Sequence, residues 1–195
     1  AMEGSIFIAG AGVQWLRDRM KFFKKAPETE KIVKSLNNNN DIYLVPAFTG
    51  LGAPYWNANA RGVLSGITRD TSPKEIVRAT IEAVAYQTFD LFEAMKHDGL
   101  RPKIVKVDGG MVMNNWFSQF LSDIVNVKVL RPKVQETTAL GAAFMAGLQI
   151  GVYKSLKDIS KNWHLDKKFS PKMKNKSRST LIKGWEKAVK RALIN

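Results

Sequence analysis

The sequence predicts a single domain of the α/β class, and three observations support this prediction. A chain of 195 residues is long enough to bury one core and short for two. The β-branched run Ile104–Val107 ends in Gly109-Gly110 and continues as an amphipathic helical pattern through 116–124. A strand pattern at 127–130 followed by a helical pattern at 136–147 repeats this order. Strands that alternate with helices are typical of α/β sheets.

The N-terminal part repeats the combination of glycines and a following helix. Residues 5–9 indicate the end of a strand or a lead-in, and Gly10–Gly12 opens a helix expected to end near Lys24. A dinucleotide fingerprint would need a third glycine where Trp15 stands, and an acidic residue that closes a second strand about 20 positions later. The sequence offers neither, so we exclude a dinucleotide site.

A helix, a turn and two strands are predicted next. The helix starts at residue 27 or 28 and ends at 36, and Asn37–Asn40 forms a flexible turn. A strand is expected at 41–46 and another at 63–67. The loop 47–62 between them is rich in glycine, proline and aromatic residues, which indicates an ordered loop shaped by its own packing.

The longest predicted helix follows Ser72 and ends near Met95. Ser72 and Glu75 form a capping box with Pro73 at the first helical position. Apolar residues cover one broad face of this helix, so we expect it to be central and buried.

Two more helices are expected toward the C-terminus. Thr137 or Thr138 can cap the helix at 136–147, whose small residues permit close approach of another helix or of backbone. The segment 181–193 repeats apolar residues at helical spacing with basic residues opposite, which predicts an amphipathic helix docked on the body.

The net charge of +14 is concentrated in the tail. Residues 151–195 hold 13 basic and three acidic residues, an excess of ten. We interpret this tail as a solvated lysine-rich surface, so nucleic-acid binding is not expected. The absence of cysteine excludes disulfides and thiolate metal sites and favours a cytoplasmic location. No apolar run reaches membrane-spanning length, and His97 and His164 stand alone, so no metal site is predicted.

The paired glycines before each helix suggest a ligand site. Without a Cβ, the main chain at Gly109-Gly110 can lie against a flat ring or a phosphate, and the following helix N-terminus favours negative charge. A tight turn that needs glycine for steric reasons alone gives the same pattern, so both interpretations stay open at this point.

Several separated motifs carry a family resemblance. Gly10–Asp18 (GAGVQWLRD), Val45–Trp56 (VPAFTGLGAPYW) and Val107–Gly110 (VDGG) followed by Asn114-Asn115 closely resemble the C-terminal domain of glycerol kinases, within the FGGY carbohydrate kinases. The segment Gly62–Glu82 is similar to the second signature of that family. The resemblance runs nearly end to end.

The resemblance implies an actin-like ATPase fold, in which two ribonuclease H-like domains close over ATP and an alcohol. The chain would be an incomplete second domain spanning 1–195, with its basic tail at about 151–195. The whole enzyme would use ATP and Mg to phosphorylate glycerol. By matching position, Gly10 and Gln14 lie near the phosphate and sugar of the nucleotide, and Gly110 and Asn114 near the adenosine and α-phosphate.

The chain departs from the family pattern in one respect that concerns catalysis. Glycerol kinases carry a Gly-Asp-Gln tripeptide whose aspartate resembles a general base, and no such tripeptide occurs here. Asp108 precedes the adenosine turn and is expected to fix that turn by hydrogen bonding. We therefore predict no catalytic residue in the chain and no activity for the chain alone.

Missing segments also predict partners. Glycerol would be held by an N-terminal part, and the loss of central strands would leave an apolar sheet edge uncovered. We expect a homo-oligomer or a complementing N-terminal fragment to cover it.

Two other functions stay open. Another FGGY kinase would act on a pentulose, although the aromatic loop 47–62 favours glycerol. From a different class, the chain could be a non-catalytic remnant or a basic binding module.

Overall fold

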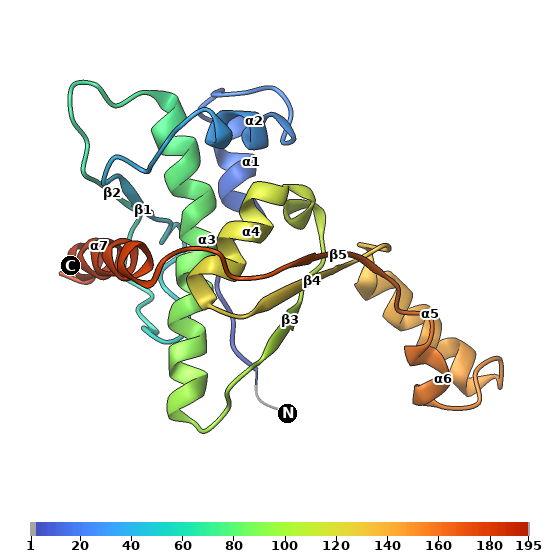
Figure 1. The fold of residues 1–195 in the computed structure, drawn as a ribbon. Helices are drawn as coiled ribbons and strands as arrows, with labels where there is room; N and C mark the ends of the chain where they lie inside the picture. The colour runs from blue at the N-terminus through green and yellow to red at the C-terminus, as the bar shows by residue number, and fades with distance from the viewer. Residues whose placement is uncertain (1–2, 195) are drawn as a thin grey trace.

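A central 25-residue helix, α3 (Pro73–His97), organises the molecule (Figure 1). The computed structural model describes residues 3–194. The predicted capping box forms: the backbone N–H of Ser72 donates to the Glu75 carboxylate over 3.0 Å, and the Ser72 hydroxyl accepts from the N–H of Lys74 over 3.2 Å. Most residues from Val77 to Gln87 are buried, so the prediction of a central buried helix is confirmed.

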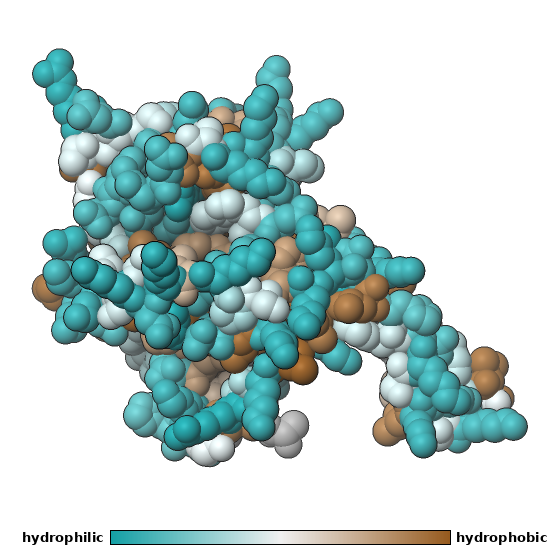
Figure 2. Space-filling view, viewed as in Figure 1, coloured by the Kyte–Doolittle hydropathy of each residue, from teal (hydrophilic) through white to brown (hydrophobic). Residues whose placement is uncertain are grey.

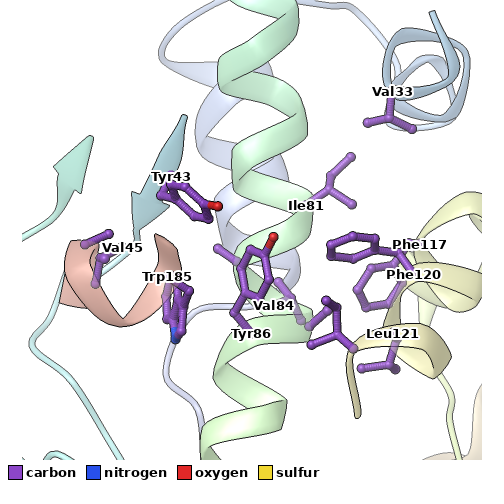
Figure 3. Close-up of a cluster of buried hydrophobic side chains, with 14 of the residues drawn as sticks. Val33, Tyr43, Val45, Ile81, Val84, Tyr86, Phe117, Phe120, Leu121 and Trp185 are labelled. Atoms are coloured by element: carbon purple, nitrogen blue, oxygen red, sulfur yellow. The ribbon is translucent and has the colours of Figure 1, made fainter. Parts of the chain in front are cut away.

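The core forms on two sides of α3 (Figure 3). Tyr86 stacks on Trp185 with ring centroids 5.3 Å apart, and it meets Phe120 edge-on at 5.6 Å. Trp185 comes from α7 (Asn175–Ala192), and Phe120 comes from α4 (Asn115–Val125). Segments a hundred residues apart therefore share one core with the central helix.

Two small sheets flank this core. β1 (Tyr43–Val45) pairs antiparallel with β2 (Val63–Ser65), inside the two segments predicted as strands. The second sheet has the order β3-β4-β5. β3 (Ile104–Lys106) runs parallel to β4 (Lys128–Pro132), as expected for a strand–helix–strand unit, and β5 (Leu165–Phe169) returns antiparallel. No strand was predicted at β5.

The N-terminal helix is shorter than predicted. Residues 5–9 form no strand and lead into α1 (Gly10–Asp18), which ends well before Lys24. Lys21 adopts a left-handed conformation at φ 59°, and this turn directs Phe23 into the core at 7% exposure. The apolar residues after Asp18 continue the helical pattern, but they reach the core through an irregular segment instead.

A second short helix, α2 (Glu28–Lys34), lies within the segment predicted for it. The asparagine run after it is a turn, yet Asn39 is only 5% exposed. The predicted turn is therefore confirmed, and one of its four asparagines is buried.

Two helices extend away from the body. α5 (Thr137–Gln149) leaves from β4 and α6 (Leu156–Ser160) leads back to β5, forming an outlying arm (Figure 1). Within this arm only Gly147 of α5 is buried, and Figure 2 shows apolar residues on its surface. The most exposed of them are Met145, Ile150, Val152 and Leu156, at 52–76%.

One prediction about α5 is wrong. Neither Thr137 nor Thr138 caps it, because the N-cap position is Glu136 and the Thr137 hydroxyl donates to the Asp108 carboxylate instead. Within the arm, Gly147 and Phe144 meet Tyr153, which follows in the chain.

The basic tail is joined to the body through β5 and α7, whereas α6 belongs to the outlying arm. β5 extends the sheet, and α7 buries Ile182, Trp185 and Val189 beside β1 while its lysines remain exposed. No described helix is both long enough and apolar enough to cross a membrane.

Candidate functional site

A pocket of about 470 Å³ opens between the N-terminal helices and the start of α4. Its walls come from α1, the segment leading into α2, α3, the 3-10 helix Gly110–Met113 and the cap of α4. The lining residues are Gly10, Val13, Gln14, Arg17, Ala26, Pro27, Thr29, Glu30, Ile81, Gly110, Met111, Met113 and Asn114. The pocket is the meeting point of segments that lie up to a hundred positions apart.

All four residues proposed from the sequence lie on this wall. Gly10 and Gln14 come from the first turns of α1, and Gly110 and Asn114 come from the turn before α4. The geometry brings the two glycine turns together at one pocket. Their contact with a nucleotide stays a prediction.

The two pocket glycines present bare backbone to open space. A Cβ built at Gly10 or at Gly110 meets no atom within 4 Å. Gly12, two positions further along the chain, differs, because its Cβ would lie 2.9 Å from the Thr80 side chain. A side chain at Gly10 or Gly110 would therefore occupy pocket volume without disturbing the fold.

The turn before Gly110 is held by its neighbours. Gly109 adopts φ +83°, a conformation that favours glycine, and its N–H donates to the carbonyl of Gln135 over 3.2 Å. The carboxylate of Asp108 accepts a hydrogen bond from Thr137, which agrees with the turn-fixing role expected for it. This contact ties the glycine turn to the first residue of α5.

Asn114 already has a structural function. Its Oδ1 accepts from the N–H of Phe117 over 3.0 Å and caps α4, while its Nδ2 donates to the hydroxyl of Thr29 over 3.4 Å. The side-chain amide is therefore oriented by the protein and does not extend freely into the pocket. The Gln14 side chain is exposed and forms no hydrogen bond to another residue of the described chain.

The two helix N-termini at the pocket differ in whether side chains cap them and in the charge beside them. α1 starts at Gly10 without a side-chain cap and without an acidic residue in its first turn. At α4, the carboxylate of Glu30 accepts from the N–H of Asn115 over 3.3 Å, in addition to the Asn114 cap. The N-terminus of α1 therefore keeps free backbone N–H groups and a partial positive charge, and this end of the pocket suits an anionic group.

The pocket residues of α2 were not predicted from the sequence. Thr29 and Glu30 line the pocket and contact Asn114 and Asn115 across 85 positions. The acidic residues in this segment were visible as a polar helical stretch, but no local pattern indicates which helix they face. Arg17 lines the pocket too, and its guanidinium is paired with Asp18 over 2.7 Å.

In the part of the chain that the structure describes, no group of three histidine, aspartate or glutamate side chains comes together at metal-binding distance.

The chain is similar to known kinases over almost all its length. The sequence model for the C-terminal domain of the FGGY family of carbohydrate kinases matches residues 1–150. Glycerol kinase 1 of Pseudomonas aeruginosa is 56% identical over 191 residues, which are 98% of this chain and 39% of that protein. The glycerol kinase of Thermoanaerobacter pseudethanolicus is 52% identical over 194 residues, covering 99% of this chain and 39% of that protein.

Solved structures show the same relationship. The crystal structure of Plasmodium falciparum glycerol kinase with ADP superposes with a TM-score of 0.87 at 38% identity, over 98% of this chain and 38% of that one. Ligand-bound xylulose kinase from Lactobacillus acidophilus has a TM-score of 0.78 at 24% identity, over 96% of this chain and 38% of that one, and shares the fold. These likenesses agree with the predicted actin-like ATPase fold.

The match covers nearly all of this chain but only part of each relative. The chain spans about two fifths of the length of the relatives it matches. Identity above 50% over nearly the whole chain, together with the family match over most of it, leaves no ambiguity about descent. The chain therefore belongs to the FGGY family of carbohydrate kinases, whose C-terminal domain it matches.

Proposed function

We propose that the chain is the nucleotide-binding C-terminal part of an ATP-dependent glycerol kinase. The whole enzyme would transfer the γ-phosphoryl group of ATP to glycerol and release glycerol 3-phosphate and ADP. Sequence identity of 52–56% to glycerol kinases supports the choice of glycerol.

The observation that carries this proposal is the convergence of Gly10, Gln14, Gly110 and Asn114 on one pocket. The two glycines leave the cradle open where a Cβ would fill it, which fits a flat or phosphorylated ligand. In our proposal the phosphate and sugar region lies toward Gly10 and Gln14, and the adenosine and α-phosphate lie toward Gly110 and Asn114. The uncapped N-terminus of α1 supports this direction.

We propose that Mg enters with the phosphates of ATP and finds its protein ligands elsewhere in the whole enzyme. Glu30 is the one carboxylate among the described pocket residues, and Lys34 and Asn115 already engage it. The pocket residues of this chain therefore do not fit a magnesium site. The general base and the glycerol contacts would likewise come from outside the chain, which would then be inactive alone.

The open surfaces support a partner that completes the domain. β3 is an edge strand on which Ile104 is 52% exposed, and the outlying arm exposes further apolar side chains. We propose that residues 1–195 act as one domain that docks an N-terminal fragment or, without it, a second copy. Sedimentation of the isolated chain as a clean monomer at about 20 µM would contradict this docking.

The alternatives are weaker. The likeness to xylulose kinases is 24% identical or less and shows the fold alone, so it gives no support for a pentulose. For a basic binding module we find no second observation beside the charge: β5 and α7 join the basic tail to the body as parts of the fold. A cytoplasmic location stays a prediction from the absence of cysteine.

The test is a calorimetric titration of ATP into the chain and two matched variants. A Cβ at Gly110 or at Gly141 meets nothing within 4 Å, but only Gly110 lines the pocket. We expect Gly141→Val to bind ATP like the parent and Gly110→Val to bind at least about tenfold more weakly. Equal binding by all three, or no binding by a folded parent, would refute the pocket as a nucleotide site in this chain.

A further inference from the structure

The side-chain amide of Asn114 is held at both of its polar atoms. Its Oδ1 accepts from the backbone N–H of Phe117 over 3.0 Å, and its Nδ2 donates to the hydroxyl of Thr29 over 3.4 Å. Because a backbone N–H can only donate, the oxygen of the amide faces α4 and the nitrogen faces α2. These two contacts give the amide a single orientation.

The hydroxyl of Thr29 acts toward this amide as an acceptor. Its own proton is donated to the carbonyl of Ala26 over 2.7 Å, and a carbonyl cannot donate in return. The hydrogen bonds therefore run in one direction, from Asn114 through Thr29 to Ala26. Thr29 is 4% exposed although it lies on the pocket wall, so solvent has little access to this arrangement.

One N–H of Asn114 remains available to a ligand. A primary amide carries two N–H donors, and Thr29 accepts one of them. The second has no protein acceptor in the part of the chain that the structure describes, and Asn114 is half-buried on the pocket wall. Gly110 lies on the same wall and leaves space for a ligand atom, since a Cβ built there meets nothing within 4 Å. The pocket thus offers an oriented donor beside open space.

We infer that Thr29 is a positioning residue that acts through Asn114: it accepts one N–H of the amide and thereby directs the other at a hydrogen-bond acceptor of the ligand. That acceptor is an atom of the adenosine or an oxygen of the α-phosphate. The identity of the ligand as a nucleotide rests on the proposed function, whereas the orientation of the amide by Thr29 does not.

This arrangement selects between ligands. A ligand that places an acceptor before the directed N–H of Asn114 gains a hydrogen bond whose geometry is set before binding. A ligand that places a donor there leaves two donors facing each other without partners, which is unfavourable in a pocket partly shielded from water. Thr29 therefore contributes to the choice of ligand through the direction of its hydrogen bonds.

The first test is a calorimetric titration of ATP into the full chain and into variants of Thr29. Thr29→Val keeps the shape of the side chain without the hydroxyl, and Thr29→Ser keeps the hydroxyl. We expect Thr29→Val to bind ATP about three- to tenfold more weakly, the range for one neutral hydrogen bond, and Thr29→Ser to restore most of this loss. The control is Thr88→Val, since Thr88 is half-buried, donates to the Val84 carbonyl over 2.7 Å and does not line the pocket.

A second background separates positioning from a general effect on the fold. Asn114→Ser keeps an acceptor for the Phe117 N–H but has no amide to be directed. In this background Thr29→Val should change ATP affinity by less than about twofold, because Thr29 acts through the amide. A merely structural role of Thr29 would weaken binding by the same factor in both backgrounds, and that result would overturn the inference.

Adenosine as a second ligand locates the acceptor. If Thr29→Val weakens the binding of ATP and of adenosine by the same factor, the acceptor belongs to the nucleoside. If it weakens the binding of ATP alone, the α-phosphate supplies the acceptor. Either result supports the directed donor, whereas equal affinities of the parent and Thr29→Val for both ligands contradict it.

A measurement without ligand distinguishes this inference from the proposed function. Nitrogen-15 relaxation gives the order parameter of the Asn114 Nδ2 group, whose signal is identified by its loss in Asn114→Ser. We expect about 0.8 in the parent and in Thr29→Ser, and less than about 0.6 in Thr29→Val. An unchanged value in Thr29→Val overturns the role of Thr29. A lowered value together with no ATP binding by the folded parent supports that role and counts against the nucleotide site.

Discussion

The indole Nε1 of Trp185 donates a hydrogen bond of 2.7 Å to the carboxylate of Asp90. The hydroxyl of Tyr55 donates to the same oxygen over 2.9 Å. One buried carboxylate on the central helix thus holds both the C-terminal helix and the aromatic loop 47–62. Burial raises the pKa of Asp90 to about 6, although both hydrogen bonds act to lower it.

This raised pKa predicts a pH dependence of stability with a defined sign. The folded chain binds a proton at Asp90 more tightly than the unfolded chain, whose carboxyl titrates near 3.8. The stabilisation is complete below about pH 4 and is lost as the pH rises through about 6, a total of about 3 kcal/mol. Urea unfolding at several pH values should show this loss in the parent relative to Asp90→Asn, which keeps an acceptor oxygen without the charge.

Removing the acceptor itself has a different effect. Asp90→Leu leaves the Trp185 N–H and the Tyr55 hydroxyl without their partner, and we expect it to cost about 2–4 kcal/mol in unfolding free energy at pH 7. Asp90→Asn is the control. If Asp90→Asn and Asp90→Leu unfold alike, the two hydrogen bonds do not hold the helix and the loop.

A second buried charge predicts a larger loss. Glu82 is fully buried, and it accepts from Arg78 over 2.7 Å and from the Tyr86 hydroxyl over 3.0 Å. Arg78→Met would leave this carboxylate without its counter-ion at a cost of about 3–5 kcal/mol. Chemical denaturation checks this value against Arg69→Met, an exposed control expected to change stability by less than about 0.5 kcal/mol. Adding Glu82→Gln to Arg78→Met should restore part of the loss.

The glycines of α1 should separate binding from stability. Gly10→Ala introduces a Cβ into open pocket space, so we expect unchanged or slightly higher stability and at least about tenfold weaker ATP binding. Gly12→Ala brings a Cβ within 2.9 Å of Thr80 and should cost about 1–3 kcal/mol. Thermal unfolding and calorimetry on both variants give the comparison. Weak binding by both, at equal stability loss, would contradict it.

Asn114 allows capping to be separated from ligand contact. Asn114→Ala removes the cap of α4 and should cost about 1 kcal/mol, whereas Asn114→Ser keeps an acceptor for the Phe117 N–H. If the amide also contacts the nucleotide, both variants bind ATP more weakly although only one is destabilised. Binding by Asn114→Ser at the affinity of the parent would mean that the residue serves α4 alone.

The sequence predicts which helices and strands occur in this fold better than it predicts where they end. The capping box before α3 and the glycine turn before α4 are local signals, since each depends on neighbouring residues. The end of α1 is not local. Met20, Phe22 and Phe23 continue the helical pattern, but the chain turns at Lys21 because Phe23 packs into the core.

In the candidate site, too, the features that depend on neighbouring residues were predicted, and those that depend on distant contacts were not. The glycine turns at Gly10 and Gly110 were found because bare backbone before a helix is visible in the sequence. Thr29 and Glu30 were not found, because their place in the pocket depends on how α2 packs against α4. The pairing of Thr137 with Asp108 was missed as well, because a threonine before a helix is read as a cap unless the distant carboxylate is known.

The outlying arm of α5 and α6 has a consequence for chain connectivity. β4 leads into the arm and antiparallel β5 leads out of it, so the hydrogen bonds between these strands close its base. A break in the backbone near Gly151, at the far turn of the arm, would leave both strands paired and the core of α3, α4 and α7 intact. Cleavage near Gly151 should therefore give two fragments that stay associated, because it cuts no strand of either sheet.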